Sequence, residues 1–101
     1  MESISKQDYI EDIYRLQQMQ NGPVKVTDLA NHMKVAKPSV SEMIKKLHSD
    51  GTVKYKRYGL ISLTDEGILH ARKYIRNHRL IERFLSDVLG LENVHEEAHS
   101  L

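Results

Sequence analysis

The end of the chain carries a metal-ligand pattern. Residues 95–99 read His-Glu-Glu-Ala-His, the H-E-x-x-H spacing that places two imidazoles on one helical face with a carboxylate beside them. In a zinc peptidase, His95 and His99 would bind the ion and Glu96 would be the general base. Such an enzyme also needs a third protein ligand and an open position for water. The motif alone is therefore compatible with a peptidase and with half of a metal site that performs no chemistry.

Two further pairs of side chains have the spacing of metal ligands. His78 and Glu82 are four residues apart, and Asp8 and Glu11 are three apart, so each pair shares a face if its segment is helical. Imidazole and carboxylate ligands without thiolate suit Mn²⁺, Fe²⁺, Co²⁺ or Zn²⁺, and the carboxylate share favours the harder metals. Taken alone, His78 and Glu82 are explained better by a surface ion pair than by a metal site, and an acidic first helical turn is a strong alternative for Asp8 and Glu11.

Composition narrows the class of protein. The chain has 101 residues, no cysteine and a net charge of +1, which predicts one small domain with an appended element and excludes disulfides and thiolate metal sites. The absence of cysteine fits a reducing compartment, so we expect a cytoplasmic protein. No apolar run approaches the roughly 20 residues of a membrane span, and the N-terminus does not resemble a signal peptide. We therefore expect no membrane partner and no small-molecule substrate.

Charge is unevenly distributed along the chain. Residues 34–57 contain seven Lys or Arg residues against Glu42 and Asp50, whereas residues 92–101 contain Glu but no Lys or Arg. Local clustering of this kind can form a nucleic-acid surface although the net charge is small. One part of the chain is suited to anions and the other to cations.

The spacing of apolar residues, together with helix-capping and helix-breaking residues, predicts the helices and strands that must position these side chains. Ser5 caps a first helix that ends near Gln20, Thr27 caps a short second helix, and a third helix with Pro38 in its first turn ends near Asp50. The second and third helices form a helix-turn-helix. Residues 53–56 and 60–63 then alternate as a β-hairpin with a cationic outer face, which is a wing.

A long helix is predicted after the wing. It begins at residues 64–67 and ends near Leu89, and its apolar residues cover more surface than a small winged domain can bury. Packing against a second copy of the chain is the simplest explanation, so we expect a homodimer. Gly90 breaks this helix, and a following helix carries His95 and His99.

The helix-turn-helix and the wing predict binding to double-stranded operator DNA. The first residues of the third helix would meet base edges, and lysines later on that helix and on the wing would contact phosphates. A solvated surface with ordinary lysines is the plainer alternative for each residue alone. The candidate DNA-binding residues are Thr27, Lys37, Pro38, Ser39, Ser41, Glu42, Lys45, Lys46, Lys54, Lys56 and Arg57.

At this point the chain resembles a known family. Asp8-Tyr9-Ile10-Glu11, the run Lys37 to Met43, Leu63 to Gly67, His78 to Leu85 and Val94 to Ala98 look like the diphtheria toxin repressor family. The resemblance covers nearly the whole chain. It implies a homodimeric repressor of metal-uptake genes that divalent metal activates, and Asp8 is similar to the manganese-regulator branch, where iron sensors usually have methionine.

The resemblance also assigns metal ligands. Asp8 and His99 match the primary regulatory site, whereas His78, Glu82 and His95 match the second site, with Glu11 a further candidate. His99 stands where manganese regulators commonly have glutamate and iron regulators cysteine. Family members continue with a Glu-His pair, and many have a further C-terminal domain, so we expect the parent protein to extend beyond this chain.

The sequence thus predicts a mainly α protein: a winged helix-turn-helix domain at residues 1–64, then metal-binding and dimerisation helices at residues 65–101. Its predicted function is repression of manganese or iron uptake genes with Mn²⁺ or Fe²⁺ as cofactor, and it is not an enzyme. Two alternatives remain at this stage. One is a metal-independent winged-helix regulator, and the other is the zinc peptidase.

Overall fold

The computed structural model describes residues 4–89 of the chain. Helix α1 (Lys6–Gln20) begins at a capping box: the Ser5 hydroxyl accepts from the Asp8 N–H, and the Asp8 carboxylate accepts from the Ser5 N–H. This arrangement satisfies backbone donors that have no partner inside the helix. The helix ends at Asn21, whose left-handed φ of 53° turns the chain. The sequence correctly placed both ends of this helix.

The helix-turn-helix follows as α2 (Val26–Met33) and α3 (Lys37–Ser49). Lys34 ends α2 with a φ of 58°, and Pro38 lies in the first turn of α3. The buried residues of α3 recur at the helical period and leave its opposite face to solvent. They are Val40, Ile44 and Leu47.

A three-stranded antiparallel sheet completes the winged domain. Its strands are β1 (Val24–Lys25), β2 (Val53–Tyr55) and β3 (Leu60–Leu63), in the order β1-β3-β2. The short 3-10 turn η1 (Arg57–Gly59) joins β2 to β3 and forms the tip of the wing. The predicted hairpin is confirmed, since Val53 pairs with Leu63 and Tyr55 with Ile61.

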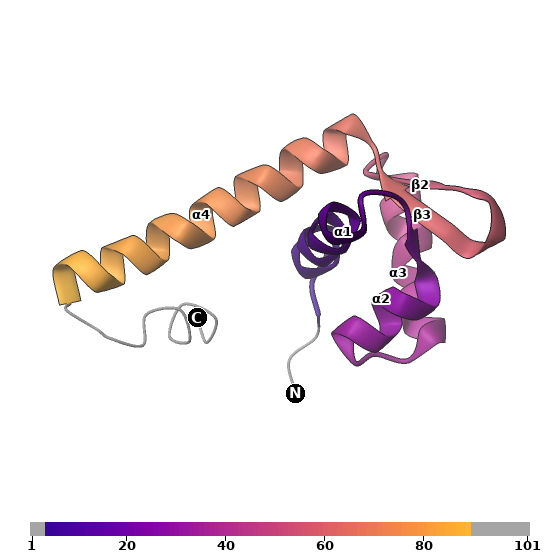
Figure 1. Ribbon diagram of the computed structural model, residues 1–101, viewed down its shortest axis with the longest axis horizontal. Helices are drawn as coiled ribbons and strands as arrows, with labels where there is room; N and C mark the ends of the chain where they lie inside the picture. Colours follow the sequence, from indigo (N-terminus) through magenta and orange to yellow (C-terminus); the bar gives the residue numbers. More distant parts are fainter. Residues whose placement is uncertain (1–3, 90–101) are drawn as a thin grey trace.

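Helix α4 (Asp65–Leu89) leaves the wing and projects away from the rest of the domain, as the orange helix in Figure 1 shows. Its 25 residues span about 37 Å at roughly 1.5 Å per residue. The first half packs along α1 and contributes Ala71 to the core. The remaining core comes from α1, α2, α3 and the sheet: Tyr9, Ile10, Ile13, Val24, Leu29, Ala30, Val40, Ile44, Leu47, Val53, Ile61 and Leu63.

Thr27 does not cap α2, and that prediction was wrong. The helix begins two residues earlier than predicted, with Lys25 at the N-cap position and no side-chain hydrogen bond there. The reason is β1, which the sequence analysis missed: Lys25 pairs with Leu60 of β3, and the chain passes directly from this strand into the helix. Thr27 is an exposed residue of the first turn.

The expected helix after Gly90, with His95 and His99, lies outside the described residues. Within residues 4–89, none of the helices is both long and apolar enough to cross a bilayer. The fold class is as predicted: mainly α, with a winged helix-turn-helix.

Candidate DNA-binding and metal-binding surfaces

The exposed face of α3 carries the residues predicted to meet DNA. Val40, Ile44 and Leu47 are fully buried, which orients the helix so that its other face points outward. No acidic residue lies in the first turn of α3, so the positive end of the helix dipole is not neutralised by its own side chains. The residues on this face are exposed, except for the half-buried Ser41: Lys37, Pro38, Ser39, Glu42, Lys45 and Lys46.

The base of the wing is fixed against the end of α3. His48 Nδ1 lies 3.1 Å from the Val53 carbonyl oxygen, and the His48 ring meets the Tyr55 ring edge-on at 5.0 Å between centroids. On the other side of the sheet, the Leu63 N–H donates to Gln17 Oε1 of α1 at 3.1 Å. These contacts hold the hairpin at a set position relative to α3.

All three predicted cations of the wing are exposed: Lys54, Lys56 and Arg57. The sequence analysis missed Tyr58 at the tip, which is 92% exposed with a φ of 62°. Its signal was the Arg-Tyr-Gly turn, which was read only as a connection. Helix α3 and the wing lie together at the end of the molecule from which α4 projects away (Figure 1), so the structure brings the predicted DNA-binding residues to one region.

Three of the predicted metal ligands line one groove between α1 and α4, a space of about 1070 Å³. Asp8 and Glu11 come from α1 and His78 comes from α4. We call this the acidic groove; its other titratable lining residues are Asp12, Arg15, His32, His70, Lys73 and Tyr74. The packing of α4 along α1 therefore brings together residues about 70 positions apart in sequence.

The carboxylates of the acidic groove already have protein partners. Asp8 Oδ2 accepts from the Ser5 backbone N–H at 3.1 Å and from the Ser5 hydroxyl at 3.0 Å. Glu11 Oε1 forms an ion pair with Arg15 Nη2 at 2.7 Å. A metal ion that bound these carboxylates would compete with Ser5 and Arg15.

Asp12 and His32 form a further charged pair in the acidic groove. Burial raises the pKa of the Asp12 carboxyl above its usual value, and the nearby His32, with its Nε2 at 3.7 Å from Asp12 Oδ1, acts in the opposite direction. Glu11 and Asp8 raise the pKa further by repulsion. The carboxyl groups of Asp8, Glu11 and Asp12 thus lie close enough to repel one another.

His78 and Glu82 are in contact on α4, with Nε2 and Oε1 3.2 Å apart. Glu82 is not among the residues that line the acidic groove. In the part of the chain that the structure describes, no three side chains of the metal-ligand types converge on one point. The remaining predicted ligands, His95 and His99, lie outside that part.

Comparisons with known proteins decide the family. Residues 1–61 match the N-terminal DNA-binding domain of the iron-dependent repressors, and residues 64–101 match their metal-binding and dimerisation domain. The chain belongs to the diphtheria toxin repressor family. The family match confirms the resemblance drawn from the sequence. Members of this family are metal-dependent transcriptional regulators and not enzymes, so the peptidase alternative is excluded and a metal-independent regulator is disfavoured.

Relatives in this family are similar to almost the whole chain. An HTH-type transcriptional regulator of Methanocaldococcus jannaschii is 41% identical over 90 residues, which cover 89% of this chain and 72% of that protein. The HTH-type transcriptional regulator MntR of Listeria welshimeri is 35% identical over 95 residues, or 94% of this chain and 66% of MntR.

Solved structures of diphtheria toxin repressor relatives have the same fold. IdeR of T. acidophilum superposes with a TM-score of 0.81 at 29% identity, over 100% of this chain and 50% of IdeR. A manganese-dependent transcriptional repressor in complex with manganese gives a TM-score of 0.80 at 36% identity, over 95% of this chain and 44% of that one. The chain thus spans about half the length of the solved structures it matches.

Proposed function

We propose that the protein represses manganese or iron uptake genes, as a homodimer that binds double-stranded operator DNA when Mn²⁺ or Fe²⁺ is abundant. Residues 1–64 are the DNA-binding part and residues 65–101 the metal-binding and dimerising part of a cytoplasmic regulator. The observation that carries the proposal is the acidic groove, where Asp8 and Glu11 of α1 meet His78 of α4. This groove lies where the middle of the long helix packs beside α1 of the winged domain.

The donor set fits the metals proposed. Carboxylate oxygens and imidazole nitrogens without thiolate suit Mn²⁺ and Fe²⁺, and the mutual repulsion of Asp8, Glu11 and the half-buried Asp12 favours a divalent cation. Within residues 4–89, both hydrogen bonds that Ser5 donates to the Asp8 carboxylate end on its Oδ2 atom. The Oδ1 atom of Asp8 is therefore the proposed metal ligand. Glu82, His95 and His99 remain candidate ligands from the family resemblance.

When bound, the metal would supply an electrostatic cross-link between carboxylates of α1 and the imidazole of α4. The residues of the chain determine what that link would control. Helix α1 packs against β3 and α2, whereas α4 projects from the domain. Holding α1 and α4 together therefore fixes the direction in which α4 leaves the DNA-binding domain, and in a dimer this sets the separation of the two recognition helices.

Manganese regulation is favoured over iron by three facts. Asp8 supplies an oxygen donor at the first-helix position, and oxygen donors suit Mn²⁺. The relatives also include proteins described as MntR and a structure described as a manganese-dependent repressor in complex with manganese. The absence of cysteine removes the thiolate that would favour a softer metal.

Calorimetry of Mn²⁺ binding to the full chain tests the metal site. His78→Ala should weaken Mn²⁺ binding by about tenfold or more, because an imidazole ligand is lost. His70→Ala is the matched control, because His70 lines the same groove and lies 3.7 Å from Glu66 but is not a proposed ligand. The Mn²⁺ affinity of this variant should stay within about twofold of wild type. Equal Mn²⁺ affinities for His78→Ala and wild type would refute the site.

A further inference from the structure

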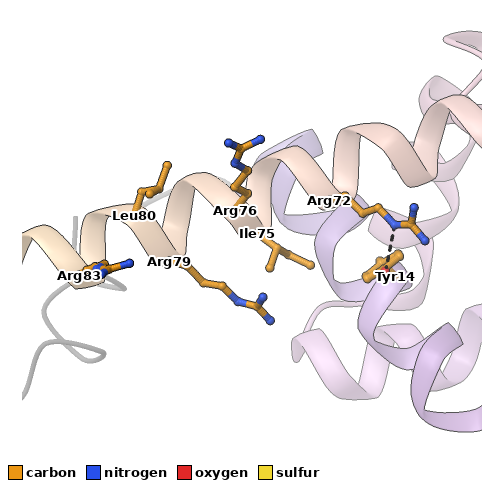
Figure 2. A pocket seen from close by; sticks show the side chains of 7 residues that line it. All are labelled: Tyr14, Arg72, Ile75, Arg76, Arg79, Leu80 and Arg83. Carbon is orange, nitrogen blue, oxygen red and sulfur yellow. Dashed lines mark hydrogen bonds between the residues drawn. The ribbon is translucent and has the colours of Figure 1, made fainter.

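A second groove lies along the α1–α4 contact and is lined mostly by arginine. It encloses about 370 Å³, and Figure 2 shows its side chains along one stretch of α4, with Tyr14 of α1 as the opposite wall. We call it the arginine groove. The residues that line it are Tyr14, Arg72, Ile75, Arg76, Arg79, Leu80 and Arg83.

The spacing of the arginines places them on one face of α4. Positions 72, 76, 79 and 83 are separated by four, three and four residues, which is the repeat of a single helical face. At roughly 1.5 Å per residue the stripe is about 16 Å long. The four arginine side chains therefore leave α4 from one face, and Figure 2 shows the Arg76 and Arg79 side chains extending to opposite sides of the helix in this view.

The charge of this stripe is not balanced by groove residues. None of the seven lining residues is a carboxylate. Arg72 Nε donates to the Tyr14 hydroxyl at 3.4 Å, which joins the stripe to α1, and Arg83 contacts the exposed Asp87 at 3.5 Å. Mutual repulsion of four cations in a concave surface favours an anionic ligand.

The arginine groove is separate from the acidic groove. The α4 residues that line the acidic groove include Lys73, Asn77 and Ile81, and by helical spacing they face the opposite side of α4 from Arg72, Arg76 and Arg79. The two grooves flank the α1–α4 contact and have opposite charge. A ligand of the arginine groove would therefore be an anion at a place where the predicted metal ligands do not lie.

We propose that the arginine groove binds a small linear polyphosphate, either inorganic triphosphate or the triphosphate of a nucleotide. Its volume is that of a small-molecule site, and the planar fork of arginine donates two parallel hydrogen bonds to phosphate. The guanidinium groups of the groove, of which Arg83 also pairs with Asp87, attract the negative charge of a triphosphate. Duplex DNA fits less well, because α3 and the wing lie at the other end of the molecule from Arg83 (Figures 1 and 2).

Calorimetry with sodium triphosphate and with ATP, in metal-free buffer and with the full chain, tests the proposal. We expect one saturable site per chain whose affinity falls as salt rises. Arg76→Ala and Arg79→Ala should each weaken binding by about threefold to tenfold, since each removes a charge-assisted contact at a partly exposed site. Arg76→Lys keeps the charge but loses the fork, so it should recover only part of the affinity.

Two matched controls locate the binding site. Lys73→Ala removes one charge from the same helix but from the acidic groove, and Lys45→Ala removes one from α3; both should bind triphosphate within about twofold of wild type. Equal affinities for triphosphate and ATP would mean that the groove recognises only the phosphates. A higher affinity for ATP would mean that the nucleoside also contacts the protein. Three results would overturn the proposal: no saturable binding, equal losses in the controls, or a preference for a hexaglutamate peptide over triphosphate.

Discussion

The two halves of α4 differ in what covers their apolar residues. In the first half, Ala71 is fully buried, and Ile68 and Tyr74 pack against the core of the winged domain. In the second half, Leu85 is buried, but Phe84 is 56% and Val88 63% exposed, although both are large and apolar. One continuous helix therefore serves two purposes: its start packs on the DNA-binding domain, and its end presents a surface that this domain does not cover.

The joint at the start of α4 is held by close backbone contacts. The Thr64 N–H donates to the Thr52 carbonyl at 3.0 Å, and the Thr64 hydroxyl donates to the Gly51 carbonyl at 2.6 Å and accepts from the Gly67 N–H at 3.1 Å. A Cβ on Gly67 would come within 2.1 Å of the Thr52 carbonyl oxygen. The end of α3, the wing and α4 thus meet where only glycine fits.

The exposed end of α4 is where a partner chain is expected. Ile81, Phe84 and Val88 leave apolar area in water, which costs free energy unless a second surface covers it. A stable joint and an uncovered end together explain how one helix can connect a DNA-binding domain to a dimer.

The largest effect is expected at the joint. Gly67→Ala should destabilise the protein by about 2 to 4 kcal/mol, because the added methyl group collides with a backbone oxygen that cannot move independently. Thermal unfolding followed by circular dichroism measures the change. Leu80→Ala, in the exposed half, is the control and should change stability by less than about 0.5 kcal/mol; equal stabilities for the two variants would mean that the halves do not differ.

The next effect is expected at the exposed end. Phe84→Glu should weaken self-association by about 2 kcal/mol, or roughly thirtyfold, since it places a charge in a buried contact. Sedimentation equilibrium measures the association, and circular dichroism checks that the fold is intact. Leu69→Glu is the matched control, because Leu69 is exposed but lies in the first half of α4; if only this control dissociated the dimer, the interface would lie elsewhere.

The smallest effect is expected in the acidic groove. Arg15→Ala should strengthen Mn²⁺ binding by about twofold to fivefold, because it removes the cation that pairs with Glu11 at 2.7 Å. Arg83→Ala, whose partner is Asp87, should leave Mn²⁺ affinity unchanged. Titration calorimetry distinguishes the two, and weaker Mn²⁺ binding by Arg15→Ala would argue that Glu11 is not a ligand.

Local signals in the sequence were enough for most of the fold. Ser5 and Asp8 form the capping box at the predicted place, and the alternation in residues 53–56 and 60–63 gave the hairpin. Strand β1 has only two residues and pairs with a strand about 36 positions later, so no local period marks it. The start of α2 was misplaced because the strand before it was missed. Lys25 makes no side-chain cap hydrogen bond, whereas Thr27 is a residue type that commonly caps helices.

The candidate sites depend on tertiary packing that residue spacing cannot supply. Spacing predicted that Asp8 and Glu11 share a face, and only the packing of α4 on α1 places His78 beside them. The role of Gly67 depends on the position of the Thr52 carbonyl, and that of the arginines on the position of Tyr14. Neither partner is near in sequence.

Metal-dependent DNA affinity tests the central claim most directly. A duplex selected from a random pool by the Mn²⁺-loaded full chain should bind the wild-type protein at least about tenfold more tightly with Mn²⁺ than in metal-free buffer, because metal and DNA favour the same arrangement of α1 and α4. His78→Ala should lose most of this difference, and His70→Ala should keep it. Equal affinity with and without Mn²⁺ would contradict the account.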